Sequence, residues 1–158
     1  MNYHGITLTS FNNGEGMRTV LWVAGCEHRC KGCQNPYTWD EAGGKEFDKE
    51  AKKKVLNALN RTWIDGLTIS GGDPLYPSNR AEVTKLVKEV KNRFPDKSIW
   101  IYTGYSYEDI KNLEIMQYID VLVDGKFVEE LVDENYKYAG STNQRIIHVN
   151  QPQKEEVV

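Results

Sequence analysis

The sequence predicts an α/β fold, either an open partial barrel or a doubly wound sheet, with about five to six mostly parallel strands. Short apolar runs alternate with segments of helical periodicity, which is the pattern of strand–helix–strand units with right-handed crossovers. With 158 residues, the chain is also too short for a closed eight-stranded barrel, which needs about 250 residues.

Five segments are predicted to be strands because they are short, apolar and mostly β-branched or aromatic. Such runs are typical of strands buried on both faces of a parallel sheet. They are residues 20–24, 67–70, 99–102, 121–123 and 146–149. A sixth strand, from Gly5 to Thr9, would pair at an edge of the sheet.

Three helices are expected between these strands. The first begins near Asp48, and the third, which is shorter, follows Ser106. The second is predicted to be capped by Asn79, with Glu82 placed three residues later as in a capping box. The apolar residues that would face the core at helical spacing are Ala51, Val55, Leu56, Leu59, Val83, Leu86, Val87, Val90, Phe94, Ile110 and Leu113.

Length and composition indicate a single domain over residues 1–150, followed by a frayed polar tail over residues 151–158. No apolar run approaches the roughly 18–20 residues that cross a bilayer, and the N-terminus lacks the features of a secretion signal. We therefore expect a cytoplasmic protein with no membrane partner. The net charge of −3 gives no electrostatic reason to expect a nucleic acid partner.

The three cysteines are the strongest chemical signal. Cys26, Cys30 and Cys33 follow a predicted strand with the spacing Cys-x3-Cys-x2-Cys. An odd number of cysteines so close together cannot form the long-range bridges of a disulfide framework, so they indicate a metal site in a reducing compartment. Thiolates are the usual ligands of iron–sulfur clusters. Three thiolates on a cube of four irons would leave one iron free for a small molecule.

Two other interpretations of the cysteines stay open. Structural zinc would need a fourth ligand, and His28, which lies between two of the cysteines, is poorly placed to supply it. His4 and His148 are the other histidines. The pair Cys30 and Cys33 also has the spacing of a thioredoxin-type motif, although a third nearby thiol makes that interpretation less favoured.

Further polar and glycine residues directly follow the predicted strands: residues 71–73, 103–104 and 124–126. In a parallel α/β fold these points meet at the carboxyl edge of the sheet, where ligands bind. Gly71 and Gly72 would let a ligand approach the backbone. A tight turn is the simpler explanation of the glycine pair alone, but the cysteine cluster at the same edge favours a ligand. Residues 140–145 precede the last strand, so they should start at the opposite edge if that strand is parallel, and a structural turn is favoured there.

These residues resemble a known family. CEHRCKGC from Cys26 and SGGDP from Ser70 resemble the radical S-adenosylmethionine superfamily. More narrowly, GEGMRTVLWVAGCEHRCKGCQNPYTW from Gly14 is similar to the activating enzymes of anaerobic ribonucleotide reductase, and SGGDPLY, IWIYTGY, DVLVDGKF and GSTNQRIIHV follow in the expected order. The resemblance extends over nearly the whole chain. One departure is Asp73, where much of the superfamily has glutamate.

The resemblance implies an open partial (β/α) barrel of the radical S-adenosylmethionine type, with a 4Fe–4S cluster on Cys26, Cys30 and Cys33. S-adenosylmethionine would bind the open iron and be cleaved by an electron to methionine and a 5′-deoxyadenosyl radical. That radical would take a hydrogen atom from a glycine of the large subunit of anaerobic (class III) ribonucleotide reductase. Reduced flavodoxin or a similar protein would supply the electron.

No side chain is assigned a catalytic role, since the cluster and its cofactor would do the chemistry. Three alternatives remain: an activase of another glycyl-radical enzyme of the pyruvate formate-lyase type, a radical enzyme acting on a small molecule, and a non-enzymatic module with structural zinc. The residues that the resemblance places near the cofactor are Gly32, Cys33, Gln34, Gly71, Gly72, Asp73, Thr103, Asp124 and Lys126.

Overall fold

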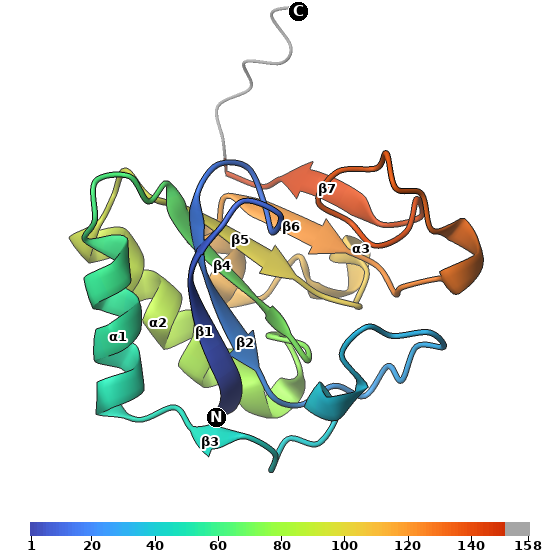
Figure 1. Ribbon diagram of the computed structural model, residues 1–158, viewed down its shortest axis with the longest axis horizontal. Helices are drawn as coiled ribbons and strands as arrows, with labels where there is room; N and C mark the ends of the chain where they lie inside the picture. The colour runs from blue at the N-terminus through green and yellow to red at the C-terminus, as the bar shows by residue number, and fades with distance from the viewer. Residues whose placement is uncertain (151–158) are drawn as a thin grey trace, which may run out of the picture.

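The computed structural model describes residues 1–150, and the predicted tail, residues 151–158, lies outside them. Seven strands form one sheet in the order β3-β1-β2-β4-β5-β6-β7 (Figure 1). The strands are β1 (Asn2–Ser10), β2 (Arg18–Val23), β3 (Lys45–Glu46), β4 (Gly66–Gly71), β5 (Ser98–Tyr102), β6 (Val121–Asp124) and β7 (Arg145–His148).

The centre of the sheet is parallel and its two ends are antiparallel. Strands β2, β4, β5 and β6 run in the same direction, as predicted. The α/β class is therefore confirmed, but the prediction of five to six mostly parallel strands is wrong, because there are seven and three of the six pairings are antiparallel. The two-residue strand β3 is too short to leave a hydrophobic pattern.

The direction of β7 has a physical cause. The chain between β6 and β7 contains only a short 3-10 turn, Glu129–Leu131, and no crossover helix. For β7 to run parallel to β6, a crossover connection of a dozen or more residues would have to carry the chain back along the sheet. A chain that stays at the edge where β6 ends instead enters the sheet antiparallel to β6. Strand β7 accordingly pairs antiparallel with β6.

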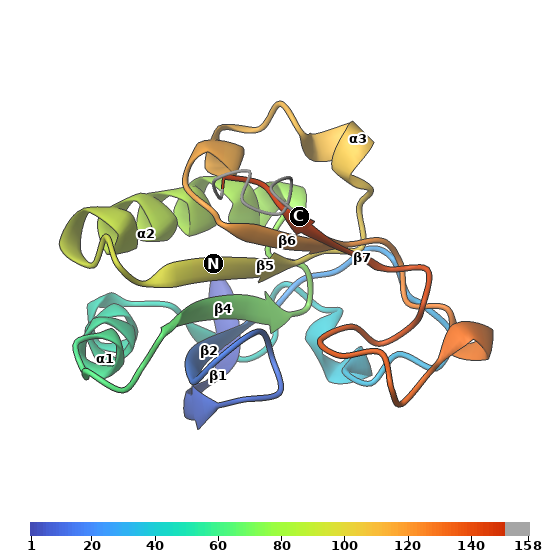
Figure 2. The same cartoon turned by 90° about the horizontal axis from the view of Figure 1, so that it is seen from above.

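The helices are α1 (Lys49–Leu59), α2 (Arg80–Arg93) and α3 (Tyr107–Ile110), and four 3-10 turns accompany them at Pro36–Thr38, Pro77–Asn79, Glu114–Gln117 and Glu129–Leu131. Helices α1 and α2 pack along one face of the sheet (Figure 2). The apolar residues predicted to face the core are buried, except that Phe94, after α2, and Leu113, after α3, are partly buried against the same core. None of the helices in residues 1–150 is long and apolar enough to span a membrane.

The predicted start of α1 and the predicted cap of α2 have different outcomes. Asp48 caps α1, since its carboxylate accepts a hydrogen bond from the Ala51 amide at 2.9 Å. Asn79 makes no side-chain cap at α2, so the capping-box prediction is wrong. A 3-10 turn leads directly into α2 and leaves Asn79 in a helical conformation, whereas a capping side chain needs an extended one. Its amide donates instead to the carbonyls of Ala24 and Asp73.

Candidate functional site

A cavity of about 360 Å³ opens at the edge where the parallel strands end. This volume lies within the range of about 300–1,000 Å³ that is typical of small-molecule sites. Side chains alternate between the two faces of a strand. One face of the sheet packs against the helices, and residues on the other face, such as Trp22, Ser70 and Tyr102, line the cavity. The other lining residues are Asn12, Asn13, Cys26, Cys30, Cys33, Gln34, Asn35, Thr38, Trp39, Gly71, Gly72, Thr103, Gly104, Gly125, Phe127, Tyr138, Ala139, Gly140 and Gln144.

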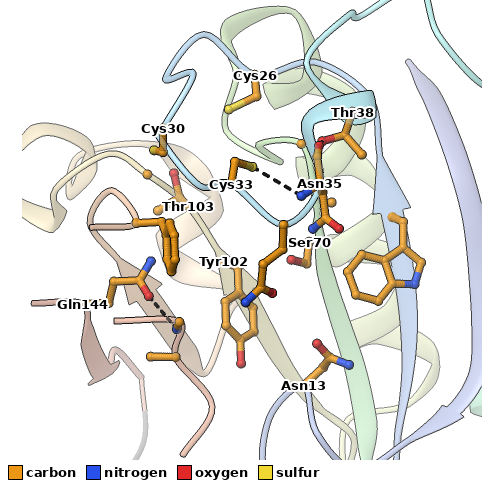
Figure 3. Close-up of a pocket in the computed structure, with 18 of the residues that line it drawn as sticks. Asn13, Cys26, Cys30, Cys33, Asn35, Thr38, Ser70, Tyr102, Thr103 and Gln144 are labelled. Atoms are coloured by element: carbon orange, nitrogen blue, oxygen red, sulfur yellow. Dashed lines mark hydrogen bonds between the residues drawn. The ribbon is translucent and has the colours of Figure 1, made fainter. Parts of the chain in front are cut away.

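All three cysteines line this cavity, and each is half-buried with a free thiol. They lie on the loop that leaves β2, and Figure 3 shows them at one end of the cavity. The loop is closed at its base by a hydrogen bond of 2.7 Å from the Gly25 amide to the Thr38 carbonyl. The spacing in sequence therefore brings three thiols to one site.

The thiols suit a cluster better than a single zinc ion. Within residues 1–150, no group of three or more His, Cys, Asp or Glu side chains is arranged to hold a metal ion. Cysteine ligands of a cubane each bind a different iron, so their sulfurs need not converge on a single point as the ligands of zinc do. The imidazole of His28 is also engaged, because its Nε2 lies 2.6 Å from a carboxylate oxygen of Asp73. The donor set thus fits a 4Fe–4S cube with one iron lacking a protein ligand.

Burial raises the pKa of the Cys26 thiol to about 11, and the nearby Asp73 carboxylate acts in the same direction. Backbone hydrogen bonds from His28 and Arg29 oppose the shift. Without a metal, this thiol is protonated at neutral pH. Iron binding requires the thiolate, so loading of the site must release a proton.

Gly71 and Gly72 bring the end of β4 against the base of the cysteine loop. Gly71 has φ +103°, and a Cβ there would lie 2.7 Å from backbone atoms of Val23. A Cβ at Gly72 would lie 2.6 Å from the carbonyl oxygen of Gly25. The glycine pair therefore has a structural role in packing, and the same backbone faces the cavity.

The remaining predicted cofactor contacts divide into two groups. Gln34 and Thr103 line the cavity together with the cysteines. Gly32 and Lys126 are exposed and do not line it. That these residues contact a cofactor stays a prediction.

Asp73 and Asp124 are each about 1% exposed, and the carboxylates of both accept hydrogen bonds from protein groups. Asp124 accepts hydrogen bonds from the Tyr107 amide at 2.7 Å and from the Arg145 guanidinium at 2.5 Å. Asp73 lies behind the cavity wall rather than in it, since it is absent from the lining residues. A direct contact of either carboxylate with a cofactor stays a prediction.

The segment before β7 lies at the opposite edge of the sheet from the one predicted for it. Because β7 is antiparallel to β6, residues 140–145 lie at the carboxyl edge of the parallel strands and not at the opposite edge. Tyr138, Gly140 and Gln144 line the cavity as a result. Gln144 fixes this segment, since its side-chain oxygen accepts from the Gly140 amide at 2.7 Å and its amide donates to the Gly125 carbonyl. The lack of a helical pattern between β6 and β7 was the signal that could have revealed it.

A loop with three free thiols at the ligand-binding edge of an α/β sheet defines a cluster-binding domain. Residues 12–147 match the family described as "4Fe-4S single cluster domain". Relatives named anaerobic ribonucleoside-triphosphate reductase-activating protein include one from Enterobacteria phage T4, 48% identical over 92% of this chain and 93% of the relative. Those of Vibrio cholerae and Escherichia coli are 43% and 40% identical over 94% of this chain, and over 97% and 99% of their own lengths. The chain belongs to the 4Fe–4S single cluster domain family and to the family of these activating proteins.

Proposed function

We propose that this protein activates anaerobic ribonucleotide reductase by generating a glycyl radical on its large subunit. The observation that supports this most directly is the convergence of Cys26, Cys30 and Cys33 on one cavity with the backbone of Gly71 and Gly72. Relatives named anaerobic ribonucleoside-triphosphate reductase-activating protein, matched over more than nine-tenths of their length, support that reductase as the partner.

When bound, a 4Fe–4S cluster would supply an open iron and the electron that cleaves S-adenosylmethionine to methionine and a 5′-deoxyadenosyl radical, and that radical would take the hydrogen atom from the target glycine. The three cysteines would hold the cluster. The backbone of Gly71 and Gly72, with Gln34 and Thr103, would bind the cofactor in the cavity beside it. The protein's part in the reaction is to place these groups and to restrict water.

This chemistry also indicates the electron donor, the cellular compartment and the way in which the target glycine reaches the cavity. A cluster of this kind needs a low-potential electron donor, for which reduced flavodoxin or a similar protein is suitable, and it needs the reducing conditions of the cytoplasm. Residues 1–150 would act as one domain, and the target glycine would enter the cavity on a segment of the reductase.

The test mixes anaerobically reconstituted, reduced protein with S-adenosylmethionine and the reductase, and then measures the glycyl radical by electron paramagnetic resonance. We expect a radical signal on the reductase and one methionine per cleaved cofactor. Methionine without the radical would refute the partner assignment. A colourless protein that contains zinc and takes up no iron would refute the cluster itself.

A substitution in the cysteine loop tests the ligand assignment. We expect Cys30→Ala to abolish cofactor cleavage while the fold is kept, because Cys30 lies on a half-exposed loop outside the core. Lys31→Ala is the matched control, since Lys31 is the exposed neighbour with no assigned ligand role. Cleavage by Cys30→Ala at the rate of the control would contradict the assignment.

A further inference from the structure

The carboxylate of Asp73 is a hydrogen-bond acceptor for groups from three separate segments. Its Oδ1 accepts from the Leu75 amide at 2.9 Å, and its Oδ2 accepts from the Gly104 amide at 2.9 Å. The Thr103 hydroxyl lies 2.9 and 3.0 Å from the two oxygens. Both oxygens of a carboxylate can accept hydrogen bonds, and the tautomer of His28 that carries its hydrogen on Nε2 donates to Oδ2 at 2.6 Å.

His28 belongs to the cysteine loop, midway between Cys26 and Cys30. Its ring packs directly on the end of β5, because a Cβ at Gly104 would lie only 2.4 Å from Cδ2 of His28. The ring also packs edge-on against Tyr105, with centroids 4.5 Å apart. The side chain of His28 is 5% exposed. Position 104 therefore has no room for a side chain while His28 occupies this place.

The backbone of Asp73 takes part in the same network of hydrogen bonds. Its amide donates to the Gly25 carbonyl at 2.6 Å, next to Cys26. The Asn79 amide bridges the carbonyls of Ala24 and Asp73, at 2.9 and 3.1 Å. Strand ends of β2, β4 and β5 thus meet at one buried residue.

We propose that His28 and Asp73 are positioning residues: the His28–Asp73 hydrogen bond fixes the cysteine loop against the ends of β4 and β5, and so sets where the thiols lie relative to Gly71 and Gly72. The inference uses the proposed function only in taking the three cysteines as cluster ligands. Asp73 then acts through the protein and does not touch the cofactor, because its oxygens are already occupied by protein donors.

The first test needs no cluster. Arg29 and Lys31 are exposed trypsin sites on the cysteine loop, and cleavage at such sites follows the population of locally opened chain. We expect His28→Leu to be cut there about tenfold faster, because a hydrogen bond to a charged group is lost. His28→Gln, whose amide can donate in the place of Nε2, should restore the slower rate.

The urea midpoint of unfolding should stay close to that of the wild type in both His28 variants, because the loop lies outside the helix-packed core. The matched control is His148→Leu, at an exposed histidine on β7. Equal cleavage of His28→Leu and wild type would overturn the proposal. Equally fast cleavage of the Leu and Gln variants would overturn it too, since ring packing alone would then hold the loop.

The second test uses protein loaded with iron and sulfide. Loss of a group that orients a metal ligand typically weakens metal binding about 10- to 100-fold. We expect His28→Leu to release iron to a chelator at least about tenfold faster, to show an altered resonance spectrum of the reduced cluster, and to be rescued by His28→Gln. Wild-type release and spectrum in His28→Leu would refute a positioning role. Wild-type protein that takes up no iron would refute the proposed function, while the trypsin result would still decide the anchoring of the loop.

Discussion

Arg18 offers the sharpest test of how the sheet is held together beneath the cavity. It is fully buried, and each N–H of its guanidinium has an acceptor. Nε donates to the Thr68 hydroxyl, Nη1 to the Glu15 carbonyl and the Ser98 hydroxyl, and Nη2 to the carbonyls of Leu67 and Ser98. Among the ion pairs of residues 1–150, none includes Arg18. The guanidinium therefore joins β2, β4 and β5 through hydrogen bonds and not through ion pairs.

The cost of Arg18→Met is the difference between two large terms. Three carbonyls lose a donor, at about 1–3 kcal/mol each where no water replaces it. In return, the variant no longer buries a charge. Burial lowers the pKa of Arg18 from 12.5 to about 10, which corresponds to a cost of roughly 3 kcal/mol at neutral pH. With about 6 kcal/mol lost and about 3 kcal/mol recovered, we expect a net destabilisation of about 3 kcal/mol.

Urea unfolding followed by tryptophan fluorescence measures this difference, because the Arg18 guanidinium lies 5.5 Å from the ring centre of Trp100. Arg61→Met is the matched control, since Arg61 lies over Trp63 on the surface at 5.6 Å. We expect that control to change stability by less than about 0.5 kcal/mol. Arg18→Lys keeps the charge but cannot span acceptors on separate strands, so it should be destabilised as well. Wild-type stability in either Arg18 variant would refute this reasoning.

Two further predictions concern the edge of the sheet around the cavity. Gly71→Ala should destabilise the protein by at least about 2 kcal/mol in urea, because of its positive φ and the 2.7 Å approach to β2, whereas Gly5→Ala, with nothing within 4 Å, should not. Asp124→Asn should lower the urea midpoint far more than Glu108→Gln, since both carboxylates bind Arg145 but only Asp124 is buried. Arg145 holds the pKa of Glu108 below its usual 4.5. The small stabilisation from the Glu108–Arg145 ion pair is therefore complete above that pH and is lost as the pH falls through the lowered pKa. Unfolding at pH 7 and pH 4 measures that loss.

The parts of the fold that local patterns determine were predictable. Apolar periodicity located α1, α2 and the central strands, because residues that face the core recur in the sequence with the period of a helix or of a strand. The convergence of the cysteine loop with residues 71–72 and 103 followed from a general rule, since parallel strands end at one edge. Both predictions needed only the order of elements along the chain.

The parts that depend on partners far away in sequence were not predictable. Asn79 has the residue type of a helix cap, but its amide is used between Ala24 and Asp73. His28 has the residue type of a metal ligand, and nothing local indicates that a carboxylate 45 residues away accepts its N–H. Such contacts arise from tertiary packing and leave no period in the sequence.

The departure at Asp73 gives the most discriminating substitution. If this carboxylate contacted the cofactor directly, Asp73→Glu should keep or strengthen binding of S-adenosylmethionine, because glutamate stands there in much of the superfamily that the sequence resembles. If the carboxylate instead anchors His28, the extra methylene must displace groups packed around a residue that is 1% exposed. Overpacking of that kind costs about 1–3 kcal/mol. We therefore expect Asp73→Glu to be less stable in urea, to be cut faster by trypsin at Arg29 and Lys31, and to bind the cofactor more weakly. Tight binding with unchanged cleavage would show that the carboxylate serves the cofactor and not the loop.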